Sequence, residues 1–131
     1  MDQILEFLKT NPTYFLATVD AQGNPQLRPF GTIARFDGGL YIQTGRSKAV
    51  YQQIKDHSRV AISGMGEGGT WIRIECDLIE DARLEAETAV MDDYPNLQGI
   101  YQPGDGNCCV FRMENISAYI DSFTAPRQVL L

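Results

Sequence analysis

Residues 27–44 read LRPFGTIARFDGGLYIQT, and this stretch indicates the class of fold. Two extended, largely apolar segments, 27–36 and 40–44, flank the turn sequence Asp37-Gly38-Gly39. Steps such as Asp-Gly and Gly-Gly supply the positive φ values that a tight turn between antiparallel strands requires. We therefore expect a β-hairpin here, and antiparallel sheet wherever similar signals recur.

Further extended segments lie on both sides of this hairpin. The clearest is 70–79, TWIRIECDLI, in which Ile72, Ile74, Cys76 and Leu78 share one face. A continuous apolar run predicts a buried strand at 14–19. Further strands are expected at 59–63, 108–113 and 116–121, with a bulge or bend at Glu114-Asn115.

Helices are fewer than strands in this pattern. One is expected after Asp2 and ends at Asn11-Pro12, one spans Ser47 to Asp56, and one of roughly twelve residues follows Asp81 and ends before Pro95. This balance predicts a mainly β (α+β) fold, an antiparallel barrel or sandwich with flanking helices.

Length and composition narrow the class of protein. The 131 residues, 44% of them hydrophobic, suit a single domain over 1–131. No apolar run is long enough to span a membrane, and the start MDQILEFLKTNP lacks a basic region, so we expect a cytoplasmic protein. The net charge of −6 argues against nucleic-acid binding. Residues 1–60 nevertheless carry +2, so an anion site is expected in that half.

The residues that most often bind metals do not form a pattern here. Cys76, Cys108 and Cys109 fit no zinc spacing, and His57 is the only histidine. We expect buried, unreactive cysteines, a histidine at a helix C-terminus and no metal site. The acidic residues of the segment 80–93 are expected to be solvated surface.

The segment Thr44-Gly45-Arg46-Ser47-Lys48 carries the strongest chemical signal. It follows a strand and opens a helix, so two cations crowd the positive end of the helix dipole. A bound phosphate would neutralise them and accept the free backbone N–H groups. Alternatively, Ser47 is only an N-cap and both cations are solvated. Neither a P-loop nor a Rossmann fingerprint is present.

Two other segments are unusual for a half-buried sheet. Arg28-Pro29-Phe30-Gly31 places a proline inside a strand, which indicates an edge, a bulge or backbone that faces a ligand. Trp71 falls on the polar face of its strand. It is either a partly covered surface aromatic or a side chain that stacks at an interface or on a ligand.

The order and spacing of these segments resemble the pyridoxamine 5'-phosphate oxidase-like FMN-binding split-barrel family, in particular its nitroimidazole resistance protein-like branch. The resemblance runs from Ile4 to Thr124. It implies a six-stranded antiparallel split β-barrel that forms a homodimer, with two FMN sites in clefts between the subunits.

The resemblance also implies roles for particular residues. Arg28, Pro29, Phe30 and Gly31 would lie beside the isoalloxazine ring, and Gln43 and Thr44 beside the ribityl chain and phosphate. Arg46, Ser47 and Lys48 would hold the phosphate. Trp71 and Arg73 would face the cleft, from the second subunit.

These implications favour a small FMN-dependent oxidoreductase that exchanges electrons with a small-molecule donor or acceptor. No catalytic residue is assigned. Pyridoxamine phosphate oxidation itself is not expected, because the segment 125–131 holds one basic residue, Arg127, where such oxidases carry a basic segment. The alternatives are a non-enzymatic flavin-binding or electron-carrier module and a split barrel that holds another ligand, such as haem or a deazaflavin.

Overall fold

Eight strands and three α-helices make up the computed structural model, which describes residues 1–131. The helices are α1 (Asp2–Thr10), α2 (Ala49–Asp56) and α3 (Leu84–Asp92), and a 3₁₀ turn, η1 (Pro95–Leu97), follows α3. The strands are β1 (Tyr14–Val19), β2 (Pro25–Phe30), β3 (Ala34–Phe36), β4 (Gly39–Gly45), β5 (Arg59–Met65), β6 (Thr70–Glu80), β7 (Cys108–Ser122) and β8 (Gln128–Val129).

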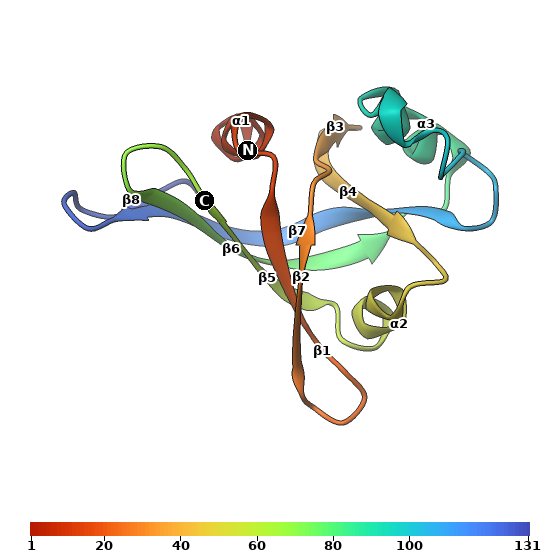
Figure 1. Cartoon of the computed structure of the whole chain (residues 1–131), viewed down its shortest axis with the longest axis horizontal. Helices are drawn as coiled ribbons and strands as arrows, with labels where there is room; N and C mark the ends of the chain where they lie inside the picture. Colours follow the sequence, from red (N-terminus) through yellow and green to blue (C-terminus); the bar gives the residue numbers. More distant parts are fainter.

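All strand pairs are antiparallel, in the order β2-β1-β5-β6-β7-β4-β3, with β8 on the edge of β7. The long strands β6 and β7 cross the whole molecule, and the β1–β2 hairpin runs steeply across them (Figure 1). The mainly β prediction is confirmed. The strand number is eight rather than six, because the segment 27–36 divides into β2 and β3 and the short β8 pairs with β7.

The main core lies where the inner faces of the strands meet α1 and α2. β6 buries Ile72, Ile74, Cys76 and Leu78, as its alternation predicts, and α2 buries Val50 and Ile54. From α1, Ile4 and Leu8 join the same cluster. The prediction of a buried strand at 14–19 holds for one face, which carries Tyr14, Leu16 and Thr18, but β1 alternates and exposes 45% of Phe15.

The predicted turn and bulge are both present. Asp37 and Gly38 have φ values of 49° and 74°, and they join β3 to β4. Asn115 also has a positive φ, 49°, at the point where two residues of β7 lie opposite Cys76 of β6. This bulge bends β7, which pairs with β6 along one edge and with β4 along the other.

Two predicted helix starts were displaced. α2 begins at Ala49 with Lys48 as its N-cap, because Arg46 and Ser47 form a turn whose N–H groups donate to Asn107. α3 begins at Leu84, since the Asp81 carboxylate accepts the Arg83 N–H and guanidinium rather than capping a helix. None of the helices combines the length and apolar character needed to cross a bilayer.

Candidate functional site

A cavity of about 560 Å³ opens beside β2, β4 and the start of α2. Its volume lies within the usual range for ligand pockets, about 300–1,000 Å³. The four residues 28–31 line it together, and so do Gln43, Thr44 and Lys48. The structure thus brings the unusual proline-containing strand and the first residue before α2 to one cavity, although they are distant in the sequence.

Charge is the distinctive property of this cavity. Arg28 and Lys48 line it, and no aspartate or glutamate does, in a chain whose net charge is −6. The Arg28 guanidinium donates only to neutral acceptors: Leu16 O (3.1 Å), Thr18 Oγ1 (2.7 Å) and Gln53 Oε1 (2.7 Å). Burial lowers the pKa of Arg28. Two uncompensated cations make the cavity suitable for an anionic ligand.

The connection between β2 and β3 forms another wall and is held by side chains. Tyr14 Oη donates to Thr32 O (2.6 Å), and Thr32 Oγ1 accepts from Gln43 N (2.9 Å). Tyr94 Oη accepts from Ile33 N (2.8 Å) and donates to Ile33 O (2.9 Å). The N–H groups of Gly31 and Thr32 donate to no protein group and remain available to a ligand.

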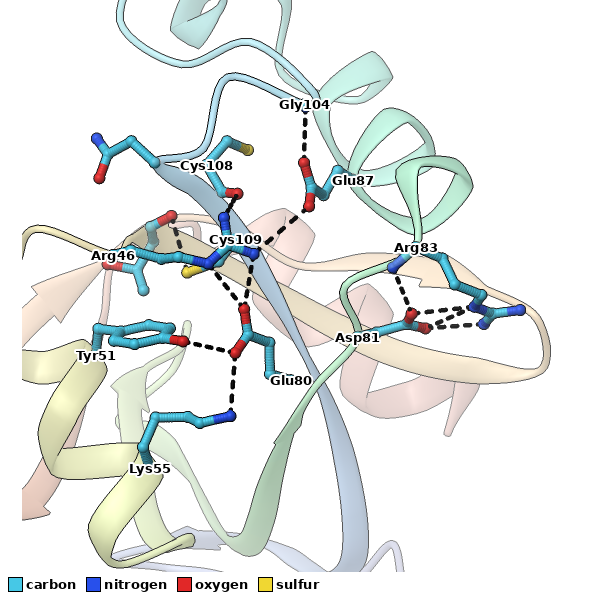
Figure 2. Close-up of polar contacts among 12 residues, drawn as sticks. Arg46, Tyr51, Lys55, Glu80, Asp81, Arg83, Glu87, Gly104, Cys108 and Cys109 are labelled. Carbon is cyan, nitrogen blue, oxygen red and sulfur yellow. Dashed lines mark hydrogen bonds and ion pairs between the residues drawn. The ribbon is translucent and has the colours of Figure 1, made fainter.

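Arg46 does not line the cavity. Its Nε and Nη2 donate to Glu80 Oε2 at 3.0 and 2.7 Å, and its Nη1 donates to Cys108 O at 3.0 Å. Glu80 Oε1 accepts from Tyr51 Oη (2.7 Å) and Lys55 Nζ (3.1 Å), as Figure 2 shows. Arg46 Nη2 also lies 3.7 Å from Glu87 Oε2. We call Arg46, Tyr51, Lys55, Glu80 and Glu87 the carboxylate network.

The carboxylate network changes the interpretation of two sequence features. Arg46 is already compensated by Glu80, so it does not need a phosphate to neutralise it. The expectation of a fully solvated acidic segment was wrong, because the side chains of Glu80 and Glu87 are only 10% and 5% exposed. Burial alone would raise the pKa of Glu80, but hydrogen bonds from Tyr51, Arg46 and Lys55 outweigh it and lower that pKa.

Ser47 is exposed, and it neither lines the cavity nor caps α2 with its side chain. Its backbone N–H donates to Asn107 Oδ1 (2.9 Å), and the N–H of Arg46 donates to Asn107 O (2.8 Å). Asn107 therefore fixes the connection from β4 to α2. The sequence analysis missed this residue, since nothing local links it to a segment sixty residues earlier.

Trp71 and Arg73 lie on β6, away from the cavity. Trp71 packs on Phe123, with the ring centroids 5.2 Å apart, and the Arg73 guanidinium lies 5.4 Å from the Tyr119 ring. Arg73 lines a separate, mostly apolar depression of about 380 Å³ together with Phe15 and Leu27. Within one chain these two side chains are therefore not part of the cationic cavity.

The segment after α3 supplies four lining residues that the sequence analysis missed: Tyr94, Asn96, Leu97 and Tyr101. The sequence pattern there indicates only a helix end at a proline. Their position follows from long-range contacts, such as the bonds from Tyr94 to Ile33, that no local signal reports.

The remaining nucleophile candidates do not contribute to the cavity. Burial raises the pKa of Cys76 and Cys109 to about 12 and that of Cys108 to about 11, which makes all three poor nucleophiles at neutral pH. His57 is the C-cap of α2, as predicted. No group of three potential metal ligands is present.

Comparison with known proteins adds to this description. The family model described as pyridoxamine 5'-phosphate oxidase matches residues 1–113. No protein among the curated sequences matches the chain. Among solved structures, a NimC/NimA family protein from Clostridium acetobutylicum has 32% sequence identity and a TM-score of 0.91, with 99% of this chain and 93% of that chain covered.

More distant structures share the fold. General stress protein 26 from Bacillus anthracis is 16% identical, with a TM-score of 0.74 and coverage of 98% of this chain and 97% of that one. A pyridoxamine 5'-phosphate oxidase-related, FMN-binding protein from Nostoc punctiforme is 19% identical, with a TM-score of 0.67 and coverage of 96% and 85%. These similarities support the split-barrel architecture that the family resemblance implies.

Proposed function

The chain belongs to the pyridoxamine 5'-phosphate oxidase family, and on that premise we propose that it is a small FMN-dependent oxidoreductase. The observation that carries the proposal is the cavity lined by Arg28 and Lys48 without any carboxylate. FMN is a dianionic ligand with a flat ring, and it matches such a site in charge. The related protein from Nostoc punctiforme is described as FMN-binding.

The lining residues fit the parts of FMN. Lys48 is the N-cap of α2, where helix dipole and side chain both favour a phosphate. Arg28 and the free N–H groups of Gly31 and Thr32 suit the polar edge of the ring system. When bound, the flavin supplies hydride and electron transfer, and the chain binds it, orients it and shapes the space beside it.

The cofactor proposal is tested by comparing two flavins. FMN and riboflavin share the ring system, but riboflavin lacks the phosphate. We expect Lys48→Ala to weaken FMN binding roughly ten- to hundred-fold, because a hydrogen bond to a charged group contributes about 1.5–3 kcal/mol. Riboflavin should bind the wild type weakly and the variant equally weakly. Fluorescence titration measures both affinities.

Lys55→Ala is the matched control, because Lys55 lies on α2 but pairs with Glu80 outside the cavity. That variant should keep the preference for FMN over riboflavin. Equal losses for both flavins in Lys48→Ala would place the phosphate elsewhere. Wild-type protein that binds neither flavin would overturn the assignment of the cofactor.

We further propose that the protein acts as a homodimer. Phe15 and Leu27 expose 45% and 67% of their surface on the outer face of the sheet, beside Arg73. A two-fold partner would cover these apolar side chains and bring Trp71 and Arg73 to the flavin site of the other subunit. Sedimentation equilibrium tests this, and a monomer with full flavin occupancy would contradict it.

A non-enzymatic electron carrier is the second candidate. It is favoured by one observation: no histidine, cysteine or carboxylate lines the cavity, so its proton-transfer candidates are limited to Lys48, Tyr94 and Tyr101. Anaerobic addition of NADH or NADPH to the flavin-loaded protein separates the two functions. Rapid loss of the oxidised flavin absorbance supports an oxidoreductase, and an unchanged spectrum supports a carrier.

A further inference from the structure

Tyr101 is a buried side chain of the cavity whose hydroxyl has no protein partner. The residue is 8% exposed and lines the cavity together with Lys48. Tyr14, Tyr51 and Tyr94 all place their hydroxyl groups in hydrogen bonds, whereas no side chain or backbone group bonds that of Tyr101. No buried polar side-chain atom of the structure lacks a partner, so this free hydroxyl is accessible, and it can donate to an acceptor on a ligand in the cavity.

The position of this hydroxyl is set by Gly45, the last residue of β4. A Cβ atom on Gly45 would lie 2.9 Å from a ring carbon of Tyr101 and 3.0 Å from its hydroxyl oxygen. Only glycine therefore lets the ring lie this close to the backbone. The hydroxyl is held at the beginning of the connection from β4 to α2, three residues before Lys48.

The surroundings of that connection contain donors and cations. Lys48 caps α2 without a side-chain partner, and the first N–H groups of an α-helix have no acceptor within the helix. The carboxylates of the nearby carboxylate network are already occupied by Arg46, Tyr51 and Lys55. A ligand group that satisfies Tyr101, Lys48 and the helix end together must be an anion with several acceptor atoms.

The loop that carries Tyr101 is rigid enough to present it. Asp105 accepts the N–H groups of Gln102, Asn107 and Cys108 at 2.9, 2.7 and 2.6 Å. Glu87 of α3 accepts the N–H of Gly104 at 2.9 Å (Figure 2). The ring is thus oriented before a ligand binds, which reduces the entropy lost on binding.

We propose that the Tyr101 hydroxyl donates a hydrogen bond to the phosphate of the bound cofactor, and so acts with Lys48 as a phosphate ligand. This inference rests on the proposed FMN function and adds a residue from a loop that no sequence motif marks. It also accounts for the ion pair between Arg46 and Glu80, because the Tyr101 hydroxyl would bind the phosphate in place of the Arg46 guanidinium.

The test is Tyr101→Phe, which removes only the hydroxyl. We expect FMN affinity to fall roughly ten-fold, as for one hydrogen bond to a charged group, with riboflavin affinity unchanged. The melting temperature of the flavin-free protein should not fall, because no protein bond is lost. The ³¹P resonance of bound FMN should shift between wild type and variant.

Tyr94→Phe is the matched control, since its hydroxyl also lies at the cavity but is saturated by Ile33 and Lys9. That variant should lower the melting temperature and affect both flavins alike. Unchanged FMN affinity in Tyr101→Phe, or equal losses for FMN and riboflavin, would overturn the role of Tyr101 while leaving the FMN proposal standing. Wild-type protein that binds no FMN would overturn both.

Discussion

Arg46 and Lys48 are two residues apart, yet they belong to regions with opposite electrostatic organisation. In the carboxylate network, each cation has a carboxylate partner: Arg46 and Lys55 both contact Glu80. In the cavity, Arg28 and Lys48 have none. The network joins α2, β6 and α3, whereas the cavity joins β2, β4 and the segment after α3.

The difference separates cations that stabilise the fold from cations that are available to a ligand. Arg28 is half-buried and Lys48 is exposed, and neither has a carboxylate partner within the chain, so both remain available to an anionic ligand. Sequence alone gives Arg46 and Lys48 the same role, since both stand before a helix. Their contacts in the folded structure give them different roles, and each role can be tested by removing a charge.

The largest effect is expected in the network. Glu80→Gln removes the carboxylate that Arg46 and Lys55 share and leaves Arg46 only Glu87 at 3.7 Å. Breaking a buried ion pair costs about 3–5 kcal/mol. Because Arg46 and Lys55 remain partly exposed to water, we expect a loss near 3 kcal/mol in the free energy of unfolding. Urea denaturation at pH 7 measures it.

Glu67→Gln is the control for this measurement, because Glu67 is exposed and its carboxylate makes no hydrogen bond or ion pair. It should change the free energy of unfolding by less than about 0.5 kcal/mol. If both variants lost the same amount, the carboxylate network would not be the stabilising region.

An intermediate effect on the free energy of unfolding is expected when Glu80 is protonated at low pH instead of being mutated. The folded pKa of Glu80 lies below its ordinary value of 4.5, so its contribution is complete above that pH and is lost as the pH falls through the folded pKa. The stability difference between wild type and Glu80→Gln should therefore shrink as the pH falls below 4.5. Urea titrations at several pH values measure it, and a constant difference would contradict the linkage.

Asp81 gives the wild type a second acid-sensitive contribution. Hydrogen bonds from Arg83 and from Tyr41 hold its pKa well below the usual range, against the effect of burial. This contribution is present in both proteins and cancels in the difference. Glu80→Gln should consequently still lose stability at low pH, with a smaller slope than the wild type.

The smallest effect is expected in the cavity. Lys48 has no partner and lies at the positive end of α2, so Lys48→Gln should leave the flavin-free protein as stable or stabilise it by about 0.3 kcal/mol. Thermal unfolding without and with FMN measures both states. A clear loss of stability in the flavin-free variant would mean that Lys48 serves the fold and not a ligand.

Much of the architecture could be predicted from local signals. The Asp37-Gly38 turn, the alternation along β6 and the bulge at Asn115 each depend on neighbouring residues, and the structure contains all three. The start of α2 could not be predicted in this way. Ser47 is a good N-cap by type, but Asn107 binds its N–H from sixty residues away.

The same distinction holds at the cavity. Arg28 to Gly31 and Lys48 line one cavity, although β2 and β4 stand near opposite ends of the strand order, so this proximity does not follow from neighbouring strands. The partner of Arg46 depends on the register between β4 and β7 and on the end of β6, where Glu80 stands. Tyr101 lies in a loop without a pattern, and only the folded structure brings it to the cavity and against Gly45.

The strand β7 has a consequence for how the protein is made. It lies between β6 and β4 and pairs with both, yet it is formed by residues 108–122, near the end of the chain. Until the ribosome releases that segment, β4 and β6 each lack β7 as their neighbour. Both strands therefore expose an unpaired edge. Such late, long-range pairing slows folding and invites association between unfinished chains. We therefore expect nascent chains halted before residue 108 to depend on chaperones, and completed chains to fold in one cooperative step.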